Sequence, residues 1–334
     1  MIELRSLTKR YGSTVGIEQL DVSVEAGEVF GLLGPNGAGK TTTLRCLVGL
    51  LGPSEGQVRV LGLDPVADHG RLAPSIGYLP GELRLYPELT GQQTLDLLAA
   101  LQGAEVPRQG ELCERLKLSR ADLARPVGQY SRGMKQKLGL VQSLQHRPPV
   151  VVLDEPTEGL DPLVQETFYE LLAGETEAGR TVLLSSHVLP EVQRTCRRVA
   201  IVRHGRLVTV RSVAELRQAR ARRVRLLLAD GRGAGPLGTA DRWSPRWDGP
   251  RVELLVPPDE VVGAVRALLA ELPVADLTVE EAGLDEAFLD LYRSVGAADA
   301  DGFETDPDGV EADPDGIDED GAHDSGRPAP EERP

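Results

Sequence analysis

The hydrophobic and polar positions of the chain form one pattern up to about residue 215 and a second pattern after it. In the first part, short apolar runs that are typical of strands alternate with longer segments of helical spacing. The strand-like runs are EVFGLLG, QVRVLG, PVVVLDE, RTVLLSS and RVAIVRHG. VVVLDE is almost wholly apolar, as expected for a strand that is buried on both faces. We therefore predict a largely parallel sheet covered by helices over residues 1–215.

Between residues 85 and 148 the strand-like runs disappear. Segments such as TGQQTLDLLAALQG and SRGMKQKLGLVQSLQ place their apolar residues at helical spacing. We therefore predict a helical insert at about residues 85–148.

After residue 215, the strand-like runs VRLLLADG, RVELLVPP and VADLTVEE alternate with helix-like segments. Two of these segments are the Arg-rich AELRQARARR and the amphipathic LDEAFLDLYR. A third carries an apolar stripe made of Val261, Val262, Val265, Leu268, Leu269 and Leu272. This order predicts a small α+β domain over residues 216–295.

The formal charge of −15 is concentrated at the end of the chain. Residues 296–334 contain 14 Asp and Glu but two Arg, whereas the rest of the chain contains 38 acidic and 35 basic residues. The nearly neutral remainder gives no reason to expect nucleic acid as a partner. Residues 296–334 are also poor in apolar side chains, which predicts an acidic disordered tail.

The composition also restricts location and redox chemistry. No run approaches the roughly 18 to 20 apolar residues of a membrane span, and MIELRSLTKRYG lacks an apolar signal core, so we expect a cytoplasmic protein. Cys46, Cys113 and Cys196 are widely spaced and form no CxxC pair, which indicates neither a disulfide framework nor a zinc site.

A Gly-rich loop, GPNGAGKTT, lies between the first apolar run and a helix-like segment. This pattern is typical of a phosphate-binding loop, in which backbone N–H groups and a helix N-terminus converge on phosphate. We predict that Lys40 holds the β and γ phosphates and that the Thr41 hydroxyl ligates magnesium. The predicted nucleotide-binding residues of the loop are Gly34, Pro35, Asn36, Gly37, Ala38, Gly39, Lys40, Thr41 and Thr42.

A carboxylate pair ends the most apolar run, VVVLDEP. Asp154 is the candidate second magnesium contact, and Glu155 is the candidate base for the attacking water. Taken alone, such a pair is about as often a solvated strand end as a site, so the assignment depends on the motifs around it.

Together these segments resemble the ATP-binding subunit of an ABC transporter over about residues 1–215. GPNGAGKTT matches the Walker A motif, VVVLDEP the Walker B motif and YSRGMKQKL the family signature. GLDP, which contains Asp161, resembles the D-loop. His187 falls at the switch histidine, and Tyr11 at the aromatic residue that stacks on adenine. The order and spacing of all six agree with the family.

The resemblance implies an α/β fold, a P-loop NTPase with a mostly parallel sheet, a helical insert and an N-terminal β subdomain. It also implies an ATPase that uses ATP and Mg²⁺. In the family, Ser131 and Gly133 contact ATP that is held by a second subunit, and Asp161 belongs to the same nucleotide site. His187 contacts the γ-phosphate and holds the water that Glu155 activates. ATP would thus join two copies of this chain, or this chain and a similar one.

The signature, PTEGLDP and LDEAFLDLYR are similar to those of the separate-subunit ATPases of drug and antibiotic exporters. This similarity implies export of a small molecule, such as a drug, an antibiotic or a lipid-like compound, through a separate multi-spanning membrane subunit. The chain would then lie on the cytoplasmic side of the membrane. We expect that subunit to dock at Tyr78–Leu89, where Leu83, Leu85 and Tyr86 would suit a groove or would fill the boundary between sheet and insert.

Two alternatives differ in function class. One is an ABC ATPase without a transporter, acting on the ribosome or DNA, but such proteins usually carry two ATP sites or coiled-coil arms, and neither is evident. A P-loop kinase lacks the signature and the D-loop. The Arg-rich stretch Arg194–Arg225 would suit nucleic acid or anionic lipid, although a solvated helical face is the simpler interpretation.

The sequence departs from the family at two positions. Gly81 stands where the family has a glutamine that ligates magnesium, and our hypothesis is that Glu82 or an ordered water replaces it. Arg132 replaces the first glycine of the signature, and its side chain could point toward phosphate or away from it. Arg132 argues against fast hydrolysis.

Overall fold

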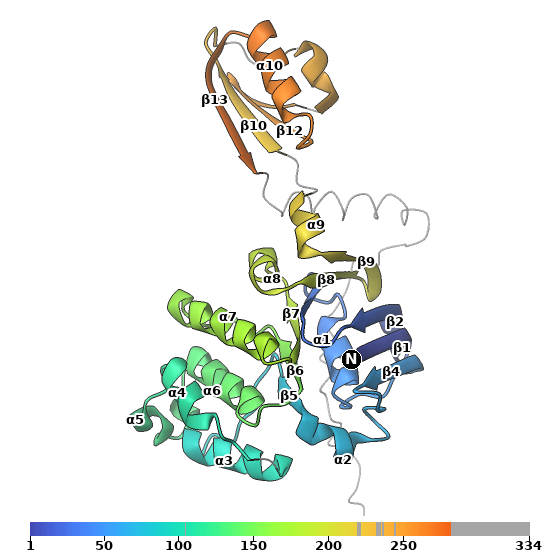
Figure 1. The fold of residues 1–334 in the computed structure, drawn as a ribbon, viewed down its shortest axis with the longest axis vertical. Helices are drawn as coiled ribbons and strands as arrows, with labels where there is room; N and C mark the ends of the chain where they lie inside the picture. The colour runs from blue at the N-terminus through green and yellow to red at the C-terminus, as the bar shows by residue number, and fades with distance from the viewer. Residues whose placement is uncertain (104, 219–221, 232–234, 236, 244, 282–334) are drawn as a thin grey trace, which may run out of the picture. The chain divides into compact units, whose positions relative to one another are not determined.

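The computed structural model describes residues 1–103, 105–218, 222–231, 235, 237–243 and 245–281, and structural statements below concern these residues (Figure 1). The described strands are β1 (Ile2–Tyr11), β2 (Thr14–Val24), β3 (Val29–Leu33), β4 (Glu55–Val60), β5 (Ile76–Leu79), β6 (Val150–Asp154), β7 (Thr181–Ser186), β8 (Arg198–Arg203), β9 (Arg206–Ser212), β10 (Arg222–Leu228), β11 (Arg246–Asp248), β12 (Arg251–Val256) and β13 (Val274–Glu281). The described helices are α1 (Lys40–Leu47), α2 (His69–Leu72), η1 (Ala73–Ser75), α3 (Gly91–Gln102), α4 (Gln109–Arg115), α5 (Arg120–Leu123), η2 (Val127–Gln129), α6 (Arg132–Leu144), α7 (Pro162–Glu177), α8 (Leu189–Thr195), α9 (Val213–Gln218), η3 (Gly238–Trp243) and α10 (Val261–Glu271).

A six-stranded sheet with the order β5-β6-β7-β3-β8-β9 forms the centre of the first part of the chain. Its first five strands are parallel, and β9 pairs antiparallel with β8. β3, β6 and β7 are buried at every position, which explains their continuous apolar runs. The α/β class is confirmed, and the carboxyl ends of β3 and β6 flank that of β7.

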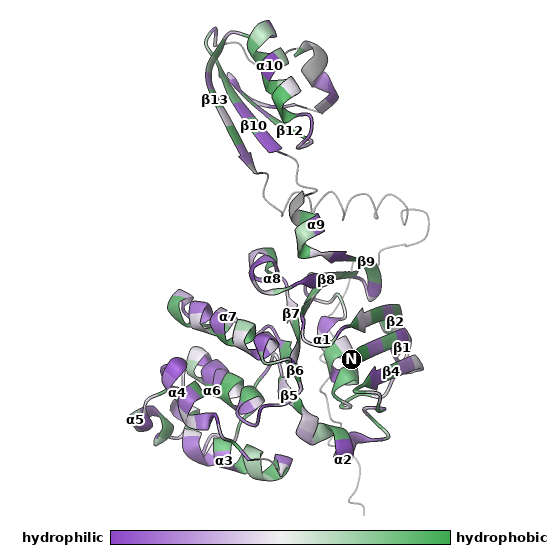
Figure 2. Cartoon of the chain, viewed as in Figure 1, coloured by the Kyte–Doolittle hydropathy of each residue, from purple (hydrophilic) through white to green (hydrophobic). Residues whose placement is uncertain are grey.

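Alternate residues of these strands enter two different cores. Val29, Val151 and Val182 pack with apolar residues of α3, α4, α6, α7 and α8, whereas Phe30 and Val152 pack with α1 and the first strands of the chain. The flanking helices are amphipathic and lie on opposite sides of the sheet (Figures 1 and 2). Both faces of the sheet are therefore covered.

A separate antiparallel sheet has the order β2-β1-β4. QVRVLG, one of the runs from which we predict a largely parallel sheet, forms β4 and pairs with β1 in this separate sheet, in agreement with the N-terminal β subdomain that the resemblance implies. Val58 and Val60 of β4 are buried and Arg59 between them is only half-buried, as in a strand with one covered face. Between Gly91 and Leu144 the named elements are helices, and Thr90 and Ser119 close capping boxes at α3 and α5.

A four-stranded antiparallel sheet, β11-β12-β10-β13, comprises the last described strands. Val224 and Leu226 face a core that includes Leu268 of α10. Two members of the expected apolar stripe on α10 are exposed instead, Val262 and Leu269, because Ala264 lies on the buried side of the helix. In AELRQARARR the helix ends at Gln218, residues 219–221 lie outside the described residues, and Arg222 begins β10. LDEAFLDLYR and the acidic tail also lie outside the described residues.

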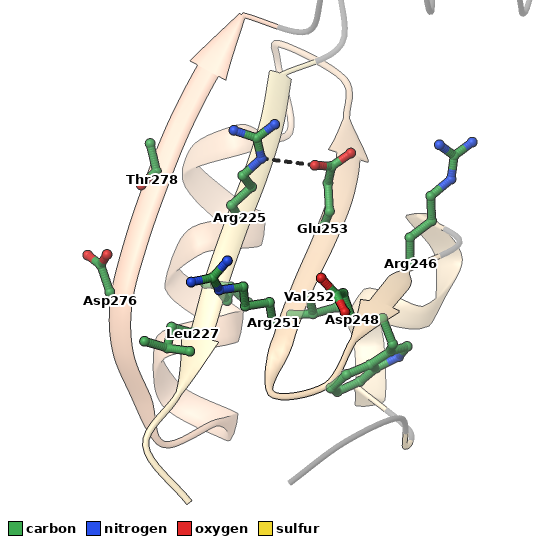
Figure 3. A pocket seen from close by; sticks show the side chains of 11 residues that line it. Arg225, Leu227, Arg246, Asp248, Arg251, Val252, Glu253, Asp276 and Thr278 are labelled. Atoms are coloured by element: carbon green, nitrogen blue, oxygen red, sulfur yellow. Dashed lines mark hydrogen bonds and ion pairs between the residues drawn. The ribbon is translucent and has the colours of Figure 1, made fainter. Parts of the chain in front are cut away.

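The face of this sheet away from α10 carries charged side chains from neighbouring strands (Figure 3). Arg225 on β10 pairs with Glu253 on β12 at 2.9 Å and with Glu280 on β13 at 3.2 Å. A shallow hollow of about 500 Å³ lies over these strands. Its open charged surface contrasts with the buried strands of the six-stranded sheet.

Two further observations concern the composition. None of the helices in the described ranges is long and apolar enough to cross a membrane. Cys46, Cys113 and Cys196 are free and buried, and burial raises the thiol pKa of Cys46 and Cys113 to about 11 and that of Cys196 to about 12. These thiols are therefore held in the neutral, unreactive form.

Candidate nucleotide-binding site

The loop between β3 and α1 depends on glycine at two positions. Gly39 has a φ of 94°, and a Cβ added there would lie 2.6 Å from the Gly16 carbonyl oxygen. A Cβ added at Gly34 would lie 2.4 Å from the Val202 carbonyl oxygen. A side chain at either position would push the loop away from the strands that support it.

The loop surrounds an open pocket of about 370 Å³. Its lining residues are Gly16, Asn36, Gly37, Ala38, Gly39, Lys40, Thr41, Thr42 and Glu155. Eight of these nine were predicted from sequence; the exception is Gly16 on β2. Gly34 and Pro35 contribute carbonyl groups that contact Lys40 instead of lining the pocket.

Lys40 is a buried cation at the start of α1. Its ammonium donates to the carbonyl oxygens of Gly34 at 2.8 Å and Pro35 at 3.1 Å, and it lies 3.2 Å from Glu155 Oε1. The β3 loop and the end of β6 are thus joined through one charge. This position suits a group that binds an anion entering the pocket.

Asp154 and Thr41 are brought together from sequence positions far apart. The Thr41 hydroxyl donates to Asp154 Oδ2 at 2.7 Å, and the Ser185 hydroxyl donates to Asp154 Oδ1 at 2.5 Å. Asp154 is almost fully buried. Two hard oxygen donors therefore lie side by side beside the pocket, the ligand type that Mg²⁺ prefers.

Glu155 lies between Lys40 and His187. Its Oε2 is 2.9 Å from His187 Nδ1, its Oε1 faces Lys40, and its backbone N–H donates to Ser185 Oγ at 3.0 Å. Its φ of 46° is unusual for a residue with a side chain and follows the last strand position, turning the carboxylate into the pocket lining.

The residues present fit a nucleotide phosphate and a divalent cation. α1 has no side-chain N-cap hydrogen bond, which leaves the first backbone N–H groups of the helix available to phosphate. Glu155 Oε1 is buried, and apart from its ion pair with the Lys40 ammonium at 3.2 Å it accepts no hydrogen bond from the described residues. Among these residues no cluster of three or more His, Cys, Asp or Glu could hold a metal, so Mg²⁺ would take Thr41 and Asp154 oxygens and complete its shell with phosphate and water.

Tyr11 ends β1 near this pocket. A Cβ added at Gly16, which lines the pocket, would lie 3.0 Å from Tyr11 Cε2. The ring is partly exposed, and the Lys9 ammonium lies 5.6 Å from its centroid. The ring therefore occupies a position from which it can stack on a base.

The signature and the D-loop contact one another and do not line the pocket. The Ser131 hydroxyl caps α6 by accepting from Met134 N–H at 3.3 Å, and the Asp161 carboxylate caps α7 by accepting from Val164 N–H at 3.1 Å. A Cβ added at Gly133 would lie 2.6 Å from the Gly159 carbonyl oxygen. These three predicted residues are absent from the lining of the pocket.

The structure shows what surrounds Arg132 and Gly81, the two positions that depart from the family pattern. Arg132 points to the residue that precedes the D-loop, since its Nη2 lies 2.5 Å from Glu158 Oε1. A Cβ added at Gly81 would lie 3.1 Å from Asp154 Oδ2, which places the missing glutamine position beside the carboxylate pair. Glu82 is 71% exposed and pairs with Arg84, so its carboxylate is not a preformed magnesium ligand. Nearby, burial and then Asp154 raise the pKa of Tyr78 to about 12.

Three polar residues join the motifs, and we did not identify them from the sequence. The Gln136 amide on α6 donates to the carbonyl oxygens of Glu155 and Pro156 at 3.2 and 3.0 Å. Glu191 on α8 accepts from Thr157 and from Ser186, which precedes His187. Ser185 holds both acidic residues of the Walker B strand. Apart from Ser186, which lies five residues before Glu191, their partners are 19 to 34 residues away along the chain, so no local motif indicates them.

The structure also describes the expected docking segment, Tyr78–Leu89, and the Arg-rich stretch, Arg194–Arg225. Leu83 and Leu85 are half-buried and pack on the core of the sheet, whereas Tyr86 is exposed. Much of Arg194–Arg225 forms strands, so a continuous helical face was wrong. Arg194, Arg198 and Arg206 pair with Glu166, Glu28 and Glu18.

Known proteins share these features. A family model described as ABC transporter matches residues 17–158, and one described as EvrA-like ABC transporter, C-terminal domain matches residues 220–280. The chain is 32% identical over 238 residues to the bacitracin transport ATP-binding protein BcrA of Enterococcus faecalis, covering 71% of this chain and 77% of that protein. A solved structure of the ATP binding subunit of an ABC transporter is similar with a TM-score of 0.61 and 29% identity, covering 65% of this chain and 92% of that one.

A further relative is longer than the matched region. The chain is 36% identical over 211 residues to the probable multidrug ABC transporter ATP-binding protein YbhF of Escherichia coli K12, which covers 62% of this chain and 36% of that protein. The match thus spans about a third of that relative's length. The motifs, the fold and the relatives agree, and the chain belongs to the ATP-binding proteins of the ABC transporter family.

Proposed function

We propose that the chain is the ATP-hydrolysing subunit of an exporter, and that two copies, or this chain and a similar one, close around two ATP molecules. The observation that carries this proposal is the contact of Glu155 with both Lys40 and His187 at the edge of the pocket. A cation for phosphate, a carboxylate for water and a histidine that orients the carboxylate are the parts that phosphoryl transfer to water needs.

Each residue has a separable role in this mechanism. Lys40 exchanges the Gly34 and Pro35 carbonyl groups for phosphate oxygens and holds them as a point charge. Bound Mg²⁺ would neutralise charge on the phosphates. Glu155 accepts the proton of the attacking water, and the His187 contact fixes the direction of its carboxylate. Asn36, Gly37 and Thr42 line the space for the phosphates.

The signature supports a site shared between two chains. Ser131 and Gly133 are predicted to contact nucleotide, yet they are not among the residues that line the pocket of their own chain. Exposed Ser131 precedes α6 as its N-cap, next to the D-loop that contains Asp161. These residues therefore suit a nucleotide held by another copy, and nucleotide state becomes a signal between two chains.

The transport role comes from the relatives. One matched protein is named for bacitracin transport and another as a probable multidrug transporter protein. By analogy, the membrane pathway for a drug, antibiotic or lipid-like cargo belongs to a separate subunit, and this chain lies at the cytoplasmic side. Exposed Tyr86 on the Tyr78–Leu89 segment is the proposed contact.

The proposed domain organisation follows the sheets. Residues 1–215, with the helical insert at about 85–148, form the ATP-binding domain. Residues 216–295 form the small C-terminal domain, and residues 296–334 form the acidic tail. The boundary near 215 falls between the six-stranded and the four-stranded sheets. Limited proteolysis that cleaves first close to residue 215 would support this boundary.

Glu155→Gln tests the proposed function. The variant keeps the size of the side chain but removes the base, so we expect ATP binding to persist, hydrolysis to fall about 10²–10⁴-fold, and ATP-dependent dimers to accumulate. The control is Glu170→Gln, an exposed residue of α7 paired with Arg115. Rapid ATP hydrolysis by Glu155→Gln would show that Glu155 is not the base.

A pull-down tests the partner. The tagged chain with ATP, isolated from its own cells in mild detergent, should bring a multi-spanning membrane protein in near-stoichiometric amount. Recovery of ribosomal proteins or DNA-bound factors instead would replace the transport role with the alternative ABC ATPase class.

A further inference from the structure

The signature helix and the D-loop are joined by an exposed ion pair that the family motifs do not explain. Arg132 is the first residue of α6, and its Nη2 lies 2.5 Å from Glu158 Oε1. The two side chains are 69% and 42% exposed. An ion pair this exposed contributes little to stability, on the order of 1 kcal/mol or less. Its position therefore calls for another explanation.

The backbone around this pair is tightly fitted. A Cβ added at Gly133 would lie 2.6 Å from the Gly159 carbonyl oxygen, and Gly159 has a φ of 76°. Lys137 on the next turn of α6 lies 3.9 Å from Asp161 of the D-loop. The seam, defined as Arg132, Gly133, Lys137 and Glu158–Asp161, thus holds the two segments in one register. Arg132 and Glu158 are the exposed end of this seam.

The charge of Arg132 is unusual at this place. A cation in the first turn of a helix opposes the partial positive charge of the helix N-terminus, and a neighbouring anion compensates for it. α6 has no acidic residue in its first turn, so Glu158, the residue before the D-loop, supplies that anion. The guanidinium also has a planar set of donors that matches a carboxylate or a phosphate equally well.

We propose that Arg132 binds phosphate of the nucleotide held by the second chain, and that Glu158 is the carboxylate it leaves when the two chains close. This inference rests on the proposed shared site, because Arg132 lies between Ser131 and Gly133. Glu158 is then an internal competitor of the nucleotide. The pair sets how much ATP is needed to hold two chains together.

This exchange of partners predicts whether each substitution weakens or strengthens ATP-dependent dimerisation. Arg132→Ala removes the phosphate ligand and leaves Glu158 as an unpaired negative charge near the nucleotide, so ATP-dependent dimerisation should weaken about tenfold. Arg132→Lys keeps the charge but loses the planar fork and should weaken it less. Glu158→Gln removes the competitor and should strengthen dimerisation severalfold.

The experiment measures the dimer dissociation constant by analytical ultracentrifugation with ATP and Mg²⁺, all variants being made in the Glu155→Gln background. Arg115→Ala and Glu170→Gln are matched controls, since they break an exposed ion pair away from the seam. Thermal unfolding checks that each variant folds; if Arg132→Ala does not, the order of Arg132→Lys and Glu158→Gln still decides.

The outcomes separate this inference from the proposed function. Opposite effects of Arg132→Ala and Glu158→Gln on the dissociation constant support the exchange. Equal weakening of dimerisation by both substitutions would mean that the ion pair only stabilises the fold. An unchanged dissociation constant in Arg132→Ala would mean that Arg132 does not contact the nucleotide. Either result overturns the inference. If the Glu155→Gln parent itself forms no ATP-dependent dimer, the shared site fails, and this inference fails with it.

Discussion

The two halves of the proposed site differ in how they are held. Asp154 and Glu155 lie at the end of the buried strand β6, Lys40 begins α1 after the loop that follows the buried strand β3, and each is fixed by contacts within the chain. Ser131, Arg132 and the D-loop lie at the surface, where Arg132 is held by an exposed ion pair. The buried half is preorganised, whereas the exposed half is free to change partners. This difference suits a site that must bind nucleotide first and assemble later.

Lys40→Ala should have the largest effect, because it removes a charge from the buried half. We expect ATP affinity to fall about a hundredfold, since charged hydrogen bonds to phosphate are lost and Glu155 keeps an uncompensated negative charge at the pocket. Equilibrium binding of a fluorescent ATP analogue measures it. Lys117→Ala, at an exposed position, is the control. An unchanged affinity in Lys40→Ala would place phosphate elsewhere.

Gly133→Ala should affect the exposed half alone. The added Cβ would lie 2.6 Å from the Gly159 carbonyl oxygen, so the seam must open, at a cost of about 1–3 kcal/mol. We expect monomer ATP affinity to stay the same while ATP-dependent dimerisation weakens. Gly110→Ala on α4, where nothing lies within 4 Å of the added Cβ, is the matched control. Loss of ATP binding by the Gly133→Ala monomer would mean that the exposed half of the site also contributes to nucleotide binding within one chain.

Glu82→Ala should have the smallest effect. The Glu82 side chain is exposed and paired with Arg84, so the magnesium dependence of ATPase activity should change by less than about twofold. Gly81→Ala is the informative comparison, because its Cβ would press on Asp154 Oδ2 from 3.1 Å. A steep loss of magnesium response in Glu82→Ala would restore our hypothesis that Glu82 replaces the missing glutamine.

Local motifs were the most reliable guide to the site. The Walker A loop could be predicted because its glycines and Lys40 are consecutive and act through the backbone. Gln136, Ser185 and Glu191 could not be predicted, since each is an ordinary polar residue whose partner lies outside its own helix or strand. Gly16 was missed for the same reason, because it approaches the loop only through the fold.

The fold shows the same division. The continuous apolar runs of β3, β6 and β7 were sufficient to predict a buried, largely parallel sheet, since a strand covered on both faces has no polar side. They did not reveal that β4 leaves this sheet to pair with β1. The apolar stripe of α10 likewise did not show that Val262 and Leu269 are exposed, because a short apolar helix offers more than one possible buried face.

By itself, then, the sequence determined the phosphate loop, the acidic pair at the end of β6 and the order of the family motifs. These features depend on consecutive residues and on the backbone geometry that they favour. Only the tertiary structure decided that Glu155 meets Lys40 and His187, that Gly81 faces Asp154, and that Arg132 pairs with Glu158. Such contacts join residues that are distant in sequence, and their partners are set by strand order and helix packing, which no local pattern records.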